Sequence, residues 1–168
     1  FKNANFSVNS VKQSPLSKKP SPPFTTSTLQ QEASRKLGFN VSRTMQAAQK
    51  LYESGHITYM RTDSVTLSET ALSSIQKTVK SEFGEKYSKT RNFSNKNKNA
   101  QQAHEAVRPT KFSNNVLNID SDQSNLYDLI WKRTVASQMS DALVDKTIVK
   151  IDSDNHEGYF QSEGEVIR

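Results

Sequence analysis

The chain has 168 residues, 33% of them hydrophobic and 24% charged, and its 23 Lys and Arg against 17 Asp and Glu give a net charge of +6. The absence of cysteine excludes disulfides and thiolate zinc sites, and three scattered histidines, His56, His104 and His156, form no spacing-defined metal site. The basic balance favours a polyanionic partner, and the lack of a long apolar run or signal-like start predicts a soluble, cytoplasmic chain without a membrane partner.

The first residues are predicted to form a strand followed by a linker. Phe6, Val8 and Ser10 alternate as strand residues do, whereas four of the five prolines fall within residues 13–23. Each proline fixes its own φ and biases the preceding residue away from a helix, so this stretch is expected to be extended and semi-rigid. Residues 1–19 are therefore interpreted as a strand segment with a proline-rich linker.

Residues 20–142 are predicted to form a largely helical domain. Ser27 or Thr28, in the hydroxyl run at residues 25–28, is expected to cap a helix that stops at Gly38, and Ser42 to cap a second helix that ends at Gly55. Capping is preferred here to a phosphate contact by these hydroxyls. The two helices form a helix-turn-helix-like pair in architecture alone, and many such pairs bind nothing.

Later helices and a terminal hairpin complete the predicted fold. Ser68 lies inside a hydrophobic staple and caps a third helix, and a polar, lysine-rich loop follows at residues 87–101. Ser121 or Asp122 caps a fourth helix, in which Trp131 is expected to pack rather than stack on bases. Residues 143–168 are predicted to form a β-hairpin. The fold class is therefore mainly α within an α+β architecture.

The stretch from His56 to Ser64 contains the candidate chemistry. Ile57, Tyr59 and Arg61 fall at period two, which predicts a short strand with Tyr59 and Arg61 on the same side. A phenol titrates near pH ~10, so a nucleophilic tyrosine needs a cation that favours the phenolate. A guanidinium also binds a phosphate bidentately. These residue types suit attack on a phosphodiester, although an isolated Tyr-x-Arg is usually an ordinary strand tyrosine beside a solvated arginine.

Three longer stretches favour the interpretation of Tyr59 as a nucleophile over that of an ordinary strand tyrosine. They are residues 22–33 (PPFTTSTLQQEA), 51–64 (LYESGHITYMRTDS) and 102–109 (QAHEAVRP). Together they closely resemble type IA DNA topoisomerases, and their order and gaps are similar to those of the bacterial topoisomerase I members. The resemblance runs through nearly the whole chain and is strongest from residue 22 to residue 109.

The resemblance implies roles for individual residues. Tyr59 is expected to be the nucleophile, with Arg61 stabilising the phenolate and the phosphate charge. The resemblance also implies contacts with single-stranded DNA for Thr58, His104 and Arg108. His104 and Arg108 lie on one face if this stretch is helical, and the open alternative is a turn in which Arg108 pairs with Glu105.

The implied activity is ATP-independent relaxation of negatively supercoiled DNA, through transient single-strand cleavage, a 5′-phosphotyrosine link, strand passage and religation. The expected partners are single-stranded and negatively supercoiled DNA and the remaining domains of the same polypeptide, at the nucleoid. By resemblance, residues 1–19 and 143–168 belong to an arch domain and residues 20–142 to the catalytic tyrosine domain. The chain alone is expected to be inactive.

Magnesium is implied as the cofactor, bound by a Toprim domain that precedes this segment in the family. Two Asp-x-Asp pairs in this chain, Asp120/Asp122 and Asp152/Asp154, are rejected as its ligands because a helix start and a hairpin turn explain them. No metal site is predicted in this chain. Two alternatives to the main hypothesis remain: a topoisomerase III or reverse-gyrase module, and a non-catalytic module that binds single-stranded DNA by stacking.

Overall fold

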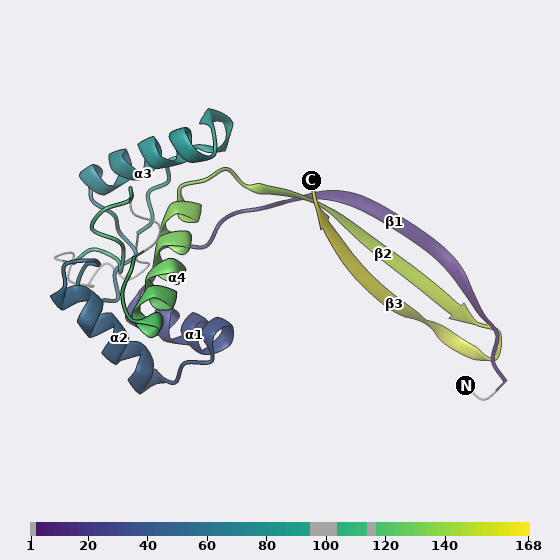
Figure 1. Cartoon of the computed structure of the whole chain (residues 1–168). Helices are drawn as coiled ribbons and strands as arrows, with labels where there is room; N and C mark the ends of the chain where they lie inside the picture. The colour runs from purple at the N-terminus through teal and green to yellow at the C-terminus, as the bar shows by residue number, and fades with distance from the viewer. Residues whose placement is uncertain (1–2, 95–103, 114–116) are drawn as a thin grey trace. The chain divides into compact units, whose positions relative to one another are not determined.

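A computed structural model describes residues 3–94, 104–113 and 117–168 of the chain (Figure 1). The chain divides into two compact units, one formed by Phe1–Lys19 with Asp141–Arg168 and the other by Pro20–Ser140. Among the described residues, no helix has the length and apolar character needed to span a membrane.

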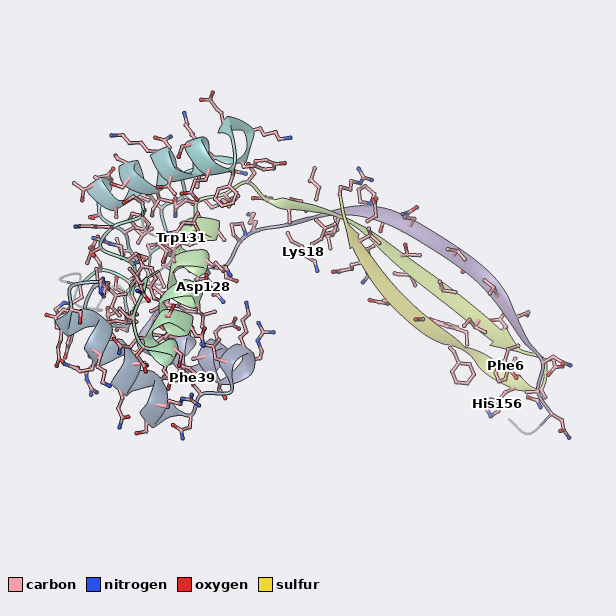
Figure 2. All side chains as sticks on the ribbon, in the orientation of Figure 1. Phe6, Lys18, Phe39, Asp128, Trp131 and His156 are labelled. Carbon is pink, nitrogen blue, oxygen red and sulfur yellow. The ribbon has the colours of Figure 1, made fainter. Side chains whose placement is uncertain are left out.

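The first unit is a three-stranded antiparallel sheet in the order β1-β2-β3. Its strands are β1 (Phe6–Lys18), β2 (Ala142–Ser153) and β3 (His156–Ile167). The predicted hairpin is confirmed, with β2 and β3 joined at residues 154–155. Figure 2 labels Phe6 and Lys18 at the two ends of β1.

The predicted linker is wrong for residues 13–18, because β1 continues through them. Pro15 lies opposite Asp145 in the ladder, and the pairing ends with Lys18 opposite Ala142. A proline lacks a backbone N–H, but an edge strand such as β1 needs only one of its two sides for pairing. The long partner strand thus overrides the local proline signal.

The two faces of this sheet differ in polarity. Residues paired across an antiparallel sheet lie on the same face. The register therefore places a group of apolar side chains on one face, which we call the apolar face, and a mixture of charged and apolar side chains on the other. The mixed face carries the ion pairs Lys18–Glu165 and Lys146–Glu163 together with Val144 and Ile148. The apolar face carries Phe6, Val8, Val11, Val149, Ile151, Phe160 and Val166.

The predicted fold class, mainly α, is also wrong. Over the described residues, helices account for 38% and extended residues for 28%, so the architecture is a balanced α+β one. The difference arises in the sheet unit, where β1 has 13 residues and β2 and β3 have 12 each.

The second unit contains the described helices. They are α1 (Thr26–Leu37), α2 (Val41–Glu53), α3 (Glu69–Glu82), the 3₁₀ turn η1 (Glu85–Tyr87) and α4 (Ser121–Ser137). The predicted cap at Ser68 is confirmed, since Ser68 caps α3. Thr25 rather than Ser27 or Thr28 caps α1. Asn40 rather than Ser42 caps α2, and Asp120 rather than its two successors caps α4. The predicted polar loop lies outside the described residues from position 95 to position 101.

A single hydrophobic core joins these helices. Within the unit, α1, α2 and α4 pack together (Figure 1). The α3 helix packs against η1. Leu51 and Ile130 are fully buried in this core. Trp131 is 6% exposed and donates from Nε1 to the Phe112 carbonyl at 3.1 Å, which confirms the predicted packing role.

Candidate active site

Residues 56–64, which we call the tyrosine segment, begin where α2 ends and follow an irregular, extended path. Gly55 has φ +73, a left-handed conformation that glycine adopts without steric cost. Ile57 makes only an isolated bridge, to Pro109. The predicted strand over residues 57–61 is therefore wrong, because successive residues bond to different parts of the chain rather than to one neighbouring strand.

Thr26, at the start of α1, holds the middle of this segment. Its backbone N–H donates to the Thr62 carbonyl at 2.9 Å, and its hydroxyl donates to the Met60 carbonyl at 2.7 Å. The Thr62 N–H in turn donates to the Thr26 hydroxyl at 2.8 Å. Met60 is fully buried. The backbone around Tyr59 is thus fixed by hydrogen bonds and by a core side chain.

Tyr59 and Arg61 alternate with buried neighbours and face solvent. Met60 and Thr62 are buried, whereas Tyr59 is 40% exposed and Arg61 is also exposed. Alternating burial therefore puts the phenol and the guanidinium on the solvent side without a regular strand. Within the described ranges, neither the Tyr59 hydroxyl nor the Arg61 guanidinium has a hydrogen-bond or ion-pair partner. Both groups are available to a ligand.

Tyr52, in the last turn of α2, contacts Tyr59 directly. The two ring centroids lie 5.2 Å apart at an interplanar angle of 66°, an edge-to-face contact. Tyr52 is 42% exposed, although the helical pattern of α2 assigns it to the apolar face. Its seven-residue separation from Tyr59 carries no periodic signal across the turn at Gly55, so the sequence does not reveal this contact.

Thr58 connects the tyrosine segment to the residues that follow His104. Its backbone N–H donates to the Arg108 carbonyl at 2.9 Å, and its hydroxyl accepts from the Arg108 N–H at 3.0 Å. The same hydroxyl donates to the Ala106 carbonyl at 2.7 Å. The single hydroxyl proton of Thr58 is already donated within the protein. Thr58 therefore links the tyrosine segment to residues 106–108 by hydrogen bonds.

Arg108 pairs with Glu105, the alternative that the sequence left open. The stretch is extended rather than helical, and the Arg108 guanidinium binds the Glu105 carboxylate and the Pro109 carbonyl. Glu105 also accepts from the Ser68 N–H at 2.5 Å. Burial raises the pKa of Glu105, but the Ser68 hydrogen bond and the Arg108 guanidinium outweigh burial and hold the pKa below its ordinary value.

His104 is exposed at the start of residues 104–109, which we call the His104 stretch. Because Thr58 pairs with Arg108, the stretch runs beside residues 56–58. Of the predicted DNA-binding residues, Thr58 and Arg108 are thus in direct contact, and His104 lies four residues before Arg108.

An open groove of about 470 Å³ lies along α2 beside Arg61. We call it the α2 groove. Its lining comes from one face of α2 and from Arg61, and comprises Ser42, Met45, Gln46, Gln49, Lys50, Glu53 and Arg61.

The acidic pairs have other uses in this fold. Asp120 caps α4, and Asp122 accepts two hydrogen bonds from Arg43 at 2.6 and 2.7 Å. Asp152 and Asp154 accept from asparagine side chains of the first unit. Across the described ranges, no group of three or more His, Asp or Glu side chains has the arrangement of a metal site. Each of these four residues thus interacts with another residue of the chain.

A family model described as DNA topoisomerase matches residues 1–168, the full length of the chain. The chain belongs to the DNA topoisomerase family. This match confirms the resemblance carried by the three motifs.

Individual topoisomerases show the same relationship. DNA topoisomerase 1 of Zymomonas mobilis is 47% identical over 165 residues, covering 97% of this chain and 14% of the relative. DNA topoisomerase 1 of Streptomyces coelicolor is 50% identical over 175 residues, covering 99% of this chain and 18% of the relative. The structure of full-length topoisomerase I from Thermotoga maritima matches with a TM-score of 0.72 and 39% identity, over 97% of this chain and 28% of that one. This topoisomerase chain therefore spans less than a third of each of these relatives.

Proposed function

We propose that this chain supplies the nucleophile of a type I topoisomerase that relaxes negatively supercoiled DNA without ATP. The Tyr59 oxygen attacks a phosphorus of single-stranded DNA and displaces the 3′ oxygen of the preceding nucleotide, which takes up a proton. The products are a 5′-phosphotyrosine link and a free 3′-hydroxyl. After strand passage, that hydroxyl attacks the same phosphorus and the tyrosine leaves. No phosphodiester is hydrolysed, so religation needs no added energy source.

The observation that carries the proposal is the presentation of Tyr59 on a fixed backbone with its hydroxyl unused. Tyr127 provides the contrast within the same unit. It is 2% exposed, its hydroxyl donates to the Lys111 carbonyl at 3.2 Å, and burial raises its pKa. A tyrosine that only packs is expected to resemble Tyr127. A nucleophile must instead reach its substrate from a defined position, because misplacement by about 1 Å costs on the order of 100-fold in rate.

The neighbouring residues have distinct roles in this proposal. Arg61 stabilises the phenolate and the charge that develops on the phosphate. His104, exposed at the start of its stretch, binds the strand near the break. Arg108 and Thr58 reach DNA only by releasing the bonds that they make within the protein, so their first role is to hold the His104 stretch against the tyrosine segment.

The rest of the reaction depends on the longer polypeptide. Magnesium enters the proposal as a cofactor held on a Toprim domain outside this chain, and no step described here passes through it. We assign the sheet unit to the arch domain of that polypeptide. Acting on chromosomal DNA, the protein works at the nucleoid.

A second candidate function is non-catalytic binding of single-stranded DNA. It is favoured by the Tyr52–Tyr59 pair, because both rings are exposed and aromatic faces stack on bases. A covalent adduct separates the two functions, since a stacking tyrosine forms none.

The decisive experiment is Tyr59→Phe in the full-length polypeptide. We expect no covalent adduct with a 3′-end-labelled oligonucleotide, while the dissociation constant for single-stranded DNA changes by less than about twofold, because only the nucleophilic oxygen is lost. Denaturing gels and fluorescence anisotropy measure the two quantities.

Tyr87→Phe is the matched control, since Tyr87 is 42% exposed and Tyr59 is 40% exposed. The control should form the adduct at the parent level. An adduct in the Tyr59→Phe protein, or one mapped to another tyrosine, would show that the nucleophile lies elsewhere.

A further inference from the structure

The α2 groove lies beside the proposed nucleophile without containing it. Its α2 residues recur at helical spacing from Ser42 to Glu53, so they form one stripe about 16 Å long. Arg61, which also lines the groove, is two residues from Tyr59, and Tyr59 in turn contacts Tyr52 on the same helix. A strand held at Tyr59 therefore has the groove within reach of its neighbouring nucleotide.

The lining suits a nucleotide. Met45 is half-buried and offers an adaptable, polarisable surface to a flat ring. The amides of Gln46 and Gln49 supply both donors and acceptors, which base edges require. Lys50 and Arg61 supply positive charge for a phosphate. The volume of about 470 Å³ lies within the range of small-molecule sites, roughly 300–1,000 Å³.

The charges of this groove are available, unlike those of another groove in the same unit. Neither Lys50 nor Arg61 forms an ion pair in the part of the chain that the structure describes. The Asp122 carboxylate, which is paired with Arg43, attracts Lys50 only from a longer distance. The groove between α1 and α4 is also lined by basic residues, but there Arg133 pairs with Glu32 and Lys132 pairs with Asp128.

One acidic group restricts how a nucleotide fits. Glu53 lines the end of the α2 groove nearest the helix C-terminus and accepts from the Gln49 side chain at 2.7 Å. Its carboxylate repels a phosphate at that end. The phosphate is therefore favoured at Lys50 and Arg61, with the base toward Met45.

We propose that the α2 groove binds one nucleotide of single-stranded DNA next to the scissile phosphate. Its base contacts Met45 and the Gln46 and Gln49 amides, and its phosphate lies at Lys50 and Arg61. This inference rests on the proposed function, and it names the part of the substrate that this surface recognises.

The test is a double-mutant cycle between protein and DNA. Gln46→Ala/Gln49→Ala is combined with oligonucleotides that carry a single abasic nucleotide at each position around the cleavage site. Dissociation constants are measured by anisotropy in the full-length Tyr59→Phe protein, so that cleavage does not interfere. We expect the Ala pair to weaken binding about three- to tenfold on intact DNA. At one abasic position next to the scissile phosphate this effect should vanish, because contacting groups are not additive.

Two controls accompany the cycle. Gln31→Ala/Gln76→Ala removes two exposed glutamines of α1 and α3 outside the groove, and it should leave every dissociation constant within about twofold of the parent, as for surface substitutions in general. Lys50→Ala should lower the magnitude of the salt dependence, log Kd against log salt, by about one phosphate contact. Lys77→Ala, an exposed lysine of α3, should not.

The outcomes separate this inference from the proposed function. Additive effects at every position, or equal effects of the two glutamine pairs, overturn the groove as a nucleotide site, whether or not the parent enzyme forms its covalent adduct. An absent adduct in the parent overturns the role of Tyr59 alone, because the binding cycle does not depend on cleavage. Loss of additivity at one position adjacent to the break supports the proposal.

Discussion

Arg61 and Arg108 lie in opposite surroundings although both are near the tyrosine segment. The Arg108 side chain is 13% exposed and held by Glu105, whereas Arg61 is exposed and has no polar partner in the described ranges. A guanidinium already paired with a carboxylate must give up that pair to bind a phosphate. Of these two arginines, Arg61 is therefore the one that can bind a phosphate without losing a partner within the protein.

We predict that Arg61→Lys in the full-length enzyme lowers the cleavage rate by roughly ten- to thousand-fold, the loss seen when one stabilising donor is removed. The ammonium keeps the charge but loses the planar pair of donors. Single-turnover adduct formation measures the rate. Arg35→Lys, an exposed and ion-paired arginine of α1, should cleave at the parent rate. If Arg61→Lys also cleaves at the parent rate, Arg61 is a solvated side chain without a role in cleavage.

Glu105 makes stability depend on pH. A carboxylate whose pKa is lowered on folding stabilises the protein above its unfolded pKa, near ~4.3, and loses that contribution as pH falls through the folded pKa. Since the pKa of Glu105 is lowered, we expect the unfolding free energy of the chain to fall from about pH 5 downward more steeply than that of Glu105→Gln. At pH 7 the variant should be less stable by about 1–2 kcal/mol. Urea unfolding followed by Trp131 fluorescence checks both, and parallel pH profiles would contradict the prediction.

At the scale of elements, local signals predict the helices and miss the connections between them. Ser68 and Gly38 act on their own helix ends, so the sequence reveals them. Tyr59 and Arg61 can likewise be recognised from the sequence, because they belong to one short motif. The roles of Thr26 and Thr58 cannot be predicted from the sequence, because each bonds to residues more than 30 positions away. The strand predicted over residues 57–61 is wrong because of the same long-range hydrogen bonds.

Thr58→Val tests the hydrogen bonds that link the tyrosine segment to the His104 stretch. Valine keeps the shape of the side chain but leaves the Ala106 carbonyl and the Arg108 N–H without their partner. We expect a loss of about 1–3 kcal/mol in unfolding free energy. Thr66→Val is the control, because the Thr66 side chain is exposed and makes no hydrogen bond among the described residues. Equal stability of the two variants would mean that the hydrogen bonds of the Thr58 hydroxyl contribute nothing to the unfolding free energy.

For the whole molecule, the nucleophile and the metal site are expected on different parts of a longer polypeptide. We predict that the isolated chain binds single-stranded DNA weakly and cleaves none of it, even with magnesium. The net charge of +6 attracts phosphates, and counterion release should weaken binding about tenfold between 50 and 200 mM salt for a few phosphate contacts. Anisotropy and denaturing gels in the same samples measure both properties. Cleavage that depends on magnesium and on Tyr59 would place the complete catalytic machinery within this chain.

The register of β1 has a consequence for the order of folding. Its last residue, Lys18, pairs with Ala142, so β1 is made 124 residues before the first part of its partner strand. At about 5–20 residues per second, β1 waits roughly 6–25 s on the ribosome with its edge unpaired. Lys12, Pro15 and Lys18 disfavour pairing with other chains during that interval. The β2–β3 hairpin closes locally, and the strand synthesised first is the last to enter the sheet.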